Sequence, residues 1–156
     1  FTNKADAQVI QRAEKYQVPS QVFTKNDLET GKVLQEINTI QPDLIVLAGF
    51  LLKFPESIVA EYPDKIINIH PALLPKYGGK GMYGMNVHRA VLEAKEKESG
   101  ITVHWVNEHY DEGDIIFQKS IPTADCTSAE DLAQKIHELE YEFFPGVIEE
   151  QLSLIP

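Results

Sequence analysis

The most constraining feature of the sequence is an uninterrupted apolar run, Leu44 to Ala48, that ends at Gly49. A run without polar alternation is typical of a parallel strand that is covered on both faces. A short helix from about Phe54 to Tyr62 follows, and then a second strand, Lys65 to His70, which stops at Pro71. The order strand, helix, strand predicts two parallel neighbours in an α/β sheet.

The remaining segments extend this pattern in both directions. Helical spacing of apolar residues predicts helices over 4–17, from Asn26 or Asp27 to about Ile40, over 86–97, and from Thr127 or Ser128 to about Leu152. A short strand is expected at 22–23, and alternation at 101–106 and 115–121 predicts an antiparallel pair. We therefore expect one α/β domain over 1–156, with an open, mostly parallel twisted sheet, an antiparallel C-terminal strand and flanking helices.

The amino-acid composition limits the kinds of molecule that the chain can bind. The formal net charge of −10 argues against nucleic acid and anionic membranes, which need Lys and Arg. The single cysteine, Cys126, has no partner for an intrachain disulfide, which fits a reducing compartment. No apolar segment reaches membrane-spanning length, and the N-terminus lacks the apolar stretch of a signal peptide. We expect a cytoplasmic protein that acts on small molecules as a monomer or homodimer.

The second strand ends in residues suited to acyl transfer. Asn68 and His70 are two apart, so their side chains point to the same face, at the end where α/β sheets bind ligands. An amide N–H and an imidazolium can stabilise the oxyanion of a tetrahedral intermediate, and the imidazole can move a proton near neutral pH. Asp111, in the loop 108–114, would raise the pKa of His70 if it lay nearby.

Each of these residues also has an ordinary structural interpretation. His70 alone is equally well explained as a hydrogen-bonded histidine at a strand end, and Asn68 as the cap of a turn. Asp111 alone is more typical of a solvated loop acid. The combination, rather than any one residue, indicates a site.

The string Asn68 to Tyr77, with Pro71 and Pro75 inside it, resembles the signature of the folate-dependent formyltransferase family. Segments in the same order along the chain resemble its glycinamide ribonucleotide branch, and these are 1–7, 47–50, 102–106 and 111–113. The resemblance implies a Rossmann-like fold. It also implies transfer of the formyl group of 10-formyltetrahydrofolate, as co-substrate, to the amine of glycinamide ribonucleotide in purine biosynthesis, without a metal.

The resemblance also implies roles for individual residues. Asn68 would bind the formyl oxygen, His70 would act as general acid or imidazolium, and Asp111 would raise the histidine pKa and order a water or the amine. The residues implied in folate binding are Leu51, Leu52, Lys53, Phe54, Asn68, Glu108, His109 and Asp111. Gly49, Pro71 and Glu140 would contact the glycinamide substrate, while Thr102 and His104 would support the site.

Three features depart from the family pattern. The strand, phosphate-binding loop and helix with which the family begins are missing, so we expect a domain without its N-terminal βα unit and without its main phosphate site. The glycine-rich stretch 78–85 is longer than in the common enzyme, and it either reshapes the mouth of the site or is a surface insertion. Lys53 stands near a position where the family often has arginine.

Other functions remain open at this level. A formyltetrahydrofolate deformylase would use the same Asn, His and Asp but pass the formyl group to water. A methionyl-tRNA formyltransferase needs a basic surface and a further domain, which an acidic chain does not favour. Zinc binding by His70, His88, His104, His109 and Asp111 is disfavoured by their irregular spacing. A non-catalytic folate-binding fragment would bind the folate but would not transfer its formyl group.

Overall fold

The computed structural model describes residues 1–155. The chain divides into two compact units, Phe1–Pro42 and a second unit that begins at Asp43. Each unit is described by itself below. All residues predicted for the site lie in the second unit.

The first unit contains α1 (Gln8–Lys15), α2 (Lys25–Glu29) and α3 (Lys32–Ile40). The single helix expected from Asn26 or Asp27 onward is therefore two helices, because Gly31 lies between them with φ of +82°. The cap is Thr24 rather than Asn26 or Asp27. The Thr24 hydroxyl accepts a hydrogen bond from the Asp27 amide, while the Asp27 carboxylate accepts one from the Thr24 amide. The strand expected at 22–23 is a single parallel bridge between Thr2 and Val22.

The second unit is a four-stranded sheet in the order β1-β2-β3-β4. Its strands are β1 (Ile45–Ala48), β2 (Ile66–His70), β3 (Glu98–Trp105) and β4 (Ile115–Pro122), and its helices are α4 (Glu56–Glu61), α5 (Met85–Glu93) and α6 (Ala129–Leu154). The open α/β sheet with flanking helices and an antiparallel last strand is as expected. Within the described residues the sheet is mixed rather than mostly parallel, because β1–β2 is parallel while β2–β3 and β3–β4 are antiparallel.

Three details of the second unit differ from the sequence-based prediction. The apolar run 44–48 does form a strand, but β1 is the outer strand of the four, and Val46 and Ala48 are exposed rather than covered on both faces. The helix expected over 86–97 ends at Glu93, and β3 begins at Glu98 instead of Ile101. The long β3 pairs over most of its length with β4, and these tertiary hydrogen bonds set its start.

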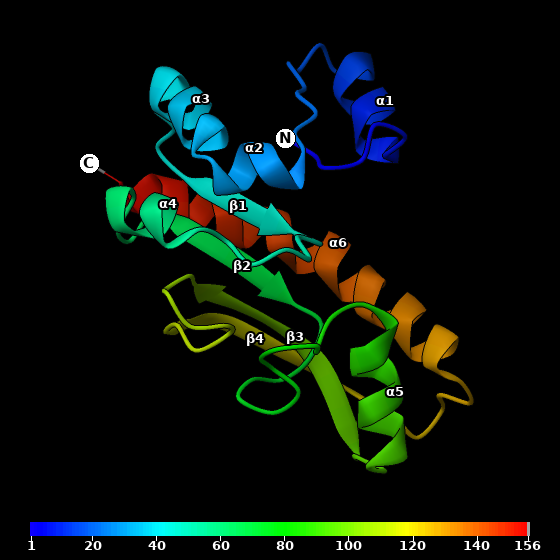
Figure 1. Ribbon diagram of the computed structural model, residues 1–156. Coiled ribbons are helices and arrows are strands. Elements are labelled where there is room, and N and C mark those ends of the chain that lie inside the picture. Colours follow the sequence, from blue (N-terminus) through cyan, green and yellow to red (C-terminus); the bar gives the residue numbers. More distant parts are fainter. Residues whose placement is uncertain (156) are drawn as a thin grey trace. The chain divides into compact units, whose positions relative to one another are not determined.

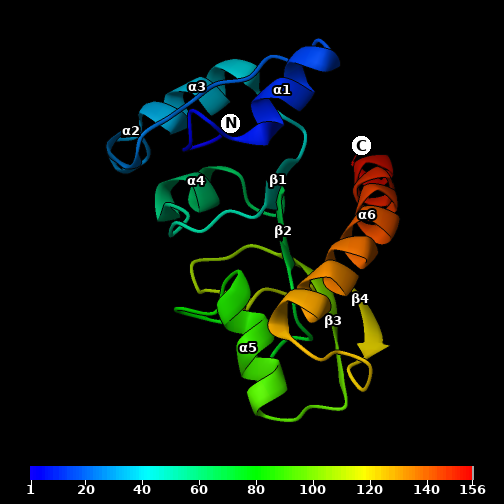
Figure 2. The ribbon, with the colours of Figure 1, turned by 90° about the vertical axis from the view of Figure 1, so that its right-hand side faces the viewer.

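Alternation along β2 and β3 separates a core face from a polar face. Ile67 and Ile69 of β2 and Ile101 and Val103 of β3 belong to one hydrophobic cluster with side chains of α5 and α6. Figures 1 and 2 show α6 along one side of the sheet and α4 on the other side of β1 and β2. Asn68 and His70 alternate with the core isoleucines and so point to the opposite face.

The long helix α6 begins as the sequence predicted. The Ser128 hydroxyl accepts a hydrogen bond from the Asp131 amide at 3.1 Å. The Asp131 carboxylate in turn accepts a hydrogen bond from the amide of Thr127, 3.1 Å away. No helix among residues 1–155 combines the length and apolar character needed to cross a bilayer.

His88 on α5 makes fold stability dependent on pH. It is buried, and burial, with the charges of His137 and His70, lowers its pKa to about 4. Since the unfolded state takes up the proton at a higher pH, the contribution of His88 to the free energy of unfolding falls as the pH drops from about 6.5 to about 4, by up to about 3 kcal/mol. His88→Leu is expected to flatten this part of the profile in urea unfolding measured at several pH values. An unchanged pH dependence in the variant would show that another group controls acid stability.

Candidate active site

Four polar residues on β2 and β3 form two cross-strand pairs on one face of the sheet. The antiparallel register places Asn68 opposite His104 and His70 opposite Thr102. Directly opposed side chains lie close enough to interact. The Asn68 amide nitrogen is 3.1 Å from Nε2 of His104. The supporting residues Thr102 and His104 are thus brought against the predicted pair Asn68 and His70.

Asp111 reaches this face from the loop between β3 and β4. Its Oδ2 atom is 3.6 Å from Nδ1 of His70, and its Oδ1 atom is 3.6 Å from Nε2 of His104. The backbone amide of Gly79 donates a hydrogen bond of 2.8 Å to Oδ2. The predicted closeness of His70 and Asp111 is therefore present, and the carboxylate lies between two imidazoles.

The hydrogen bonds assign protons to the two rings. Nδ1 of His104 is 2.8 Å from the carbonyl oxygen of Trp105, and a carbonyl only accepts, so Nδ1 carries the proton. When neutral, His104 accepts at Nε2 from the Asn68 amide. This uses one of the two N–H groups of Asn68 and leaves the other available to a formyl oxygen.

His70 makes one hydrogen bond through its ring and one close contact. Nε2 donates to the carbonyl oxygen of Tyr77 at 2.7 Å, and Nδ1 faces Asp111. The residue is only 3% exposed. Proton exchange on this ring is therefore confined to Nδ1, on the side of the carboxylate.

The pKa of His70 is lowered on balance, although Asp111 acts on it in the predicted upward direction. Burial lowers the pKa of His70, and this outweighs the upward influence of Asp111 and of the Tyr77 carbonyl. Burial also acts on Asp111, raising its pKa, but the contacts with His104, the Gly79 amide and His70 prevail and hold the pKa of Asp111 below its usual value. The pair is thus an ionised carboxylate beside an imidazole that is mostly neutral at pH 7.

Thr102 connects the site to β4 through a residue that sequence reasoning missed. The Thr102 hydroxyl donates to the carbonyl of Ala72 at 2.7 Å and accepts from the Leu74 amide at 3.0 Å. The amide of Gln118 donates to both Thr102 Oγ1 and the Leu74 carbonyl, each at 2.9 Å. This network fixes the chain after Pro71. The only signal for Gln118 was its place in an alternating strand, and its partner depends on the β3–β4 register.

The residues expected to bind folate lie in different surroundings. Lys53, Glu108 and His109 line one cavity of about 470 Å³ with Gly79, Lys80, Tyr110 and Glu112. Lys53 is held by Glu56 through an ion pair of 2.7 Å. Phe54 packs edge-on against Phe50, Leu52 is half-buried, and Leu51 is exposed. Three members of the predicted set, Lys53, Glu108 and His109, thus share one cavity, while Asp111 lines another.

The residues expected to contact the glycinamide substrate occupy two places. Gly49 follows β1 and Pro71 follows β2, and the parallel register, which pairs Ala48 with Ile69, brings these two strand ends side by side. Gly49 has φ of +65°, a conformation that favours glycine. Glu140 is half-buried on α6, where burial raises its pKa against the opposing charge of His137.

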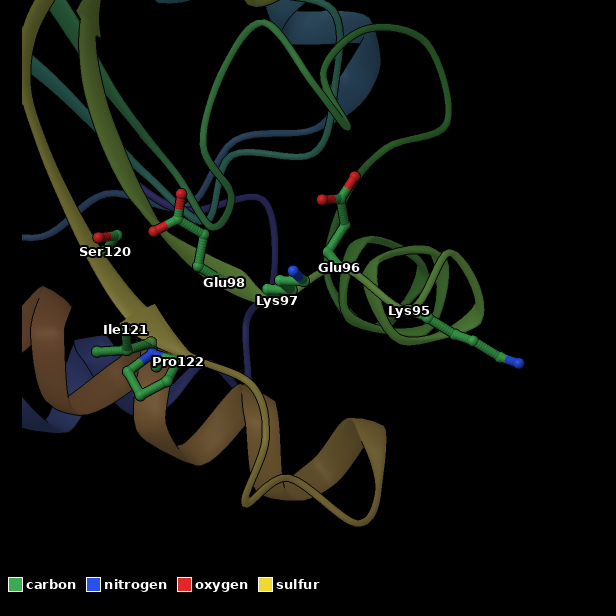
Figure 3. Close-up of a pocket in the computed structure, with 7 residues that line it drawn as sticks. All are labelled: Lys95, Glu96, Lys97, Glu98, Ser120, Ile121 and Pro122. Carbon is green, nitrogen blue, oxygen red and sulfur yellow. The ribbon is translucent and has the colours of Figure 1, made fainter.

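The second unit has two further cavities. One of about 580 Å³ lies against the loop 110–115 and includes Asp111 with Leu74, Pro75, Gly78 and Gly79. The other, of about 660 Å³, is lined by residues 95–98 and 120–122 and holds none of the predicted site residues (Figure 3). Within residues 1–155, no group of three or more His, Cys, Asp or Glu side chains is arranged to hold a metal ion.

Gly113 controls the approach of the Asp111 loop to β3. A Cβ atom at this position would lie 1.7 Å from the carbonyl oxygen of Trp105, a backbone atom that cannot move aside. Gly113→Ala is expected to destabilise the fold by about 1–3 kcal/mol and to displace Asp111. Gly146→Ala on α6 is the matched control, because nothing lies within 4 Å of the added atom. Equal free energies of unfolding for the two variants would contradict this account of the loop.

The sequence matches the profile of the Formyl transferase family over residues 1–148. The chain belongs to the formyl transferase family. A chloroplastic phosphoribosylglycinamide formyltransferase of Arabidopsis thaliana is 37% identical over 162 residues, covering 97% of this chain and 56% of the relative. The phosphoribosylglycinamide formyltransferase of Bacillus subtilis is 36% identical over 157 residues, covering 97% of this chain and 78% of the relative. The chain spans about half the length of the two plant relatives it matches, 56% of one and 49% of the other.

Solved structures of formyl transferases share the fold. The crystal structure of phosphoribosylglycinamide formyltransferase from Anaplasma phagocytophilum aligns with a TM-score of 0.87 at 32% identity, covering 97% of this chain and 72% of that one. Glycinamide ribonucleotide transformylase 1 from Geobacillus kaustophilus aligns with a TM-score of 0.84 at 33% identity, covering 99% of this chain and 80% of that one. These agreements confirm the Rossmann-like formyltransferase fold expected from the sequence.

Proposed function

We propose that this chain carries the active site of a phosphoribosylglycinamide formyltransferase. It would move the formyl group of 10-formyltetrahydrofolate to the amine of glycinamide ribonucleotide. The observation that carries the proposal is the position of Asp111 between His70 and His104, beside the Asn68 carboxamide, on one face of the sheet. The names of the relatives support the choice of substrates.

The reaction needs charge stabilisation and one proton transfer. The amine nitrogen attacks the formyl carbon and forms a new C–N bond, and the formyl oxygen becomes an oxyanion. The C–N10 bond of the folate then breaks, N10 takes up a proton and the former amine loses one. The free N–H of Asn68 is the donor to the oxyanion, and one such donor in a shielded site is worth about 3–4 kcal/mol.

His70 and Asp111 form the proton-handling pair. His70 exchanges a proton at Nδ1, since Nε2 is committed to Tyr77. Asp111, held ionised by its surroundings, stabilises the imidazolium that forms when Nδ1 takes up the proton. His104 orients Asn68 and contacts the same carboxylate.

The binding roles complete the proposal. The folate would lie along Leu51, Leu52, Lys53 and Phe54 and under the loop of Glu108 and His109. The glycinamide would lie between Gly49, Pro71 and Glu140. A half-buried carboxylate such as Glu140 suits an amine, whose charge would lower its raised pKa again. The single-domain organisation, the cytoplasmic location and a monomeric or homodimeric state stay predictions.

The proposal is tested by supplying 10-formyltetrahydrofolate and glycinamide ribonucleotide to this chain, and to the chain with a family N-terminal βα unit fused before Phe1. Formylated glycinamide ribonucleotide, measured by mass spectrometry, is the expected product of at least the extended protein. Folate binding without product from either protein would leave only a binding function and refute the proposal.

A further inference from the structure

The main chain at residues 77–79 contacts both members of the His70–Asp111 pair. The Tyr77 carbonyl accepts from Nε2 of His70 at 2.7 Å, and two residues later the Gly79 amide donates to Oδ2 of Asp111 at 2.8 Å. Gly78, between them, has no room for a side chain, because a Cβ atom would lie 2.6 Å from Leu74 Cδ2 and 3.1 Å from Asp111 Cβ. One short stretch of backbone thus orients the imidazole and the carboxylate together.

The Tyr77 carbonyl decides which ring nitrogen of His70 exchanges the proton. Because a carbonyl cannot donate, it holds the neutral ring as the Nε2–H tautomer and leaves the lone pair on Nδ1. Nδ1 is the nitrogen that faces Asp111. Without the carbonyl, the neutral ring would be free to place its proton on Nδ1, and it could then no longer accept one there.

The backbone of Tyr77 needs an anchor to hold this carbonyl. Tyr77 has φ of +58°, a left-handed conformation that non-glycine residues rarely adopt. Its ring packs against the hydrophobic core, and its hydroxyl donates to Oε1 of Glu96 at 3.0 Å. The Lys76 ammonium reaches the same oxygen at 2.9 Å. These contacts offset the cost of the left-handed backbone.

Glu96 is itself held rigidly. It lies on the connection between α5 and β3, as Figure 3 shows. Its backbone amide donates to the Val91 carbonyl at 3.2 Å, and its own carbonyl accepts from the Thr123 hydroxyl. The Glu96 side chain is only 26% exposed. A fixed carboxylate outside the site is therefore connected to His70 through Tyr77.

We propose that residues 77–79 form a backbone clamp, anchored by Glu96, that fixes the tautomer of His70 and the orientation of Asp111, with Tyr77 and Glu96 as positioning residues for the reaction. The proposal rests on formyl transfer as the function of this site. Neither residue contacts the reacting atoms, so both act on the rate of the chemical step rather than on substrate affinity.

Tyr77→Phe tests the clamp, because it removes the hydroxyl bonded to Glu96 and keeps the carbonyl. The expected result is a fall in kcat of about 10-fold with KM for the folate changed by less than about twofold. Nitrogen NMR of protein labelled in its histidines is expected to show only the Nε2–H tautomer for His70 in the natural chain at pH 7.5, and a growing Nδ1–H population in the variant. Tyr83→Phe, which removes an exposed hydroxyl from the same glycine-rich stretch, is the control and should change neither quantity.

If Tyr77→Phe keeps both the Nε2–H tautomer of His70 and the kcat of the unsubstituted chain, the clamp is refuted. A fall in kcat with an unchanged His70 tautomer would refute it as well. If Tyr77→Phe does not fold, Glu96→Gln, which weakens the same bond, carries the test with the same two readouts. The NMR result needs no turnover. A chain without formyl transfer but with the expected tautomer shift would therefore refute the proposed function while supporting the clamp.

Discussion

Replacing His70 with alanine is expected to lower the turnover of formyl transfer by about 10³-fold or more while leaving folate affinity nearly unchanged. The variant loses an imidazole whose Nδ1 faces Asp111, where it can take up a proton, and whose Nε2 is fixed by the Tyr77 carbonyl. General acid–base catalysis by a positioned side chain contributes about 10²–10⁴-fold, which sets the size of the effect. The measurement is kcat with saturating substrates, alongside equilibrium binding of the folate.

The His70 variant needs a control for folding, because the residue is buried and alanine leaves a cavity. His70→Gln fills more of that space and is expected to show nearly the same loss of turnover with a higher melting temperature. Turnover near the natural value in either folded variant would show that His70 does not take part in the reaction. Loss of affinity with unchanged turnover would instead make it a binding residue.

Asp111→Asn is expected to lower turnover by about 10²-fold or more. The asparagine keeps the shape and an oxygen to accept from the Gly79 amide, so the loop position survives, but the negative charge between His70 and His104 is lost. The charge stabilises the imidazolium, and its removal leaves burial as the dominant influence on the pKa of His70. The measurement is kcat as a function of pH.

The direction of the pH effect follows from the same contacts. Asp111 raises the pKa of His70, so Asp111→Asn moves that pKa further down, and the protonated ring disappears at a lower pH than in the natural chain. In the profile of kcat against pH, the limb that reports protonated His70 should therefore move to lower pH in Asp111→Asn. Asp111, whose own pKa is lowered, contributes stability above about pH 4 that is lost as the carboxylate is protonated. A shift of the limb to higher pH would contradict the assignment.

Local chemistry allowed the strand tips and much of the site to be predicted from the sequence. The alternation of β2 put Asn68 and His70 on one face, and Pro71 marked the strand end, since these features depend on neighbours in sequence. The cap at Thr24 had a visible signal in Thr24 and Asp27, although the cap was predicted at Asn26 or Asp27. The expected helix divides at Gly31, where the backbone has φ of +82°.

The features of the site that could not be predicted depend on the register between paired strands and on burial in the folded chain. The pairing of Asn68 with His104 follows from antiparallel β2–β3 register, and the Gln118 network from β3–β4 register. The Tyr77 contact needs a left-handed backbone at a tyrosine, which no local pattern indicates. Burial, which lowers the pKa of His70 overall, became visible only in the folded chain, whereas the upward influence of Asp111 was predicted.

The fate of an isotopically labelled formyl group tests the central claim most directly. The chain, and its form with an N-terminal βα unit added, would receive labelled 10-formyltetrahydrofolate with and without glycinamide ribonucleotide. We expect the label to pass to the amine of the ribonucleotide, with little free formate, and the transfer to be lost in His70→Ala. Label released as formate at the same rate whether or not the ribonucleotide is present would identify a hydrolase and contradict the account.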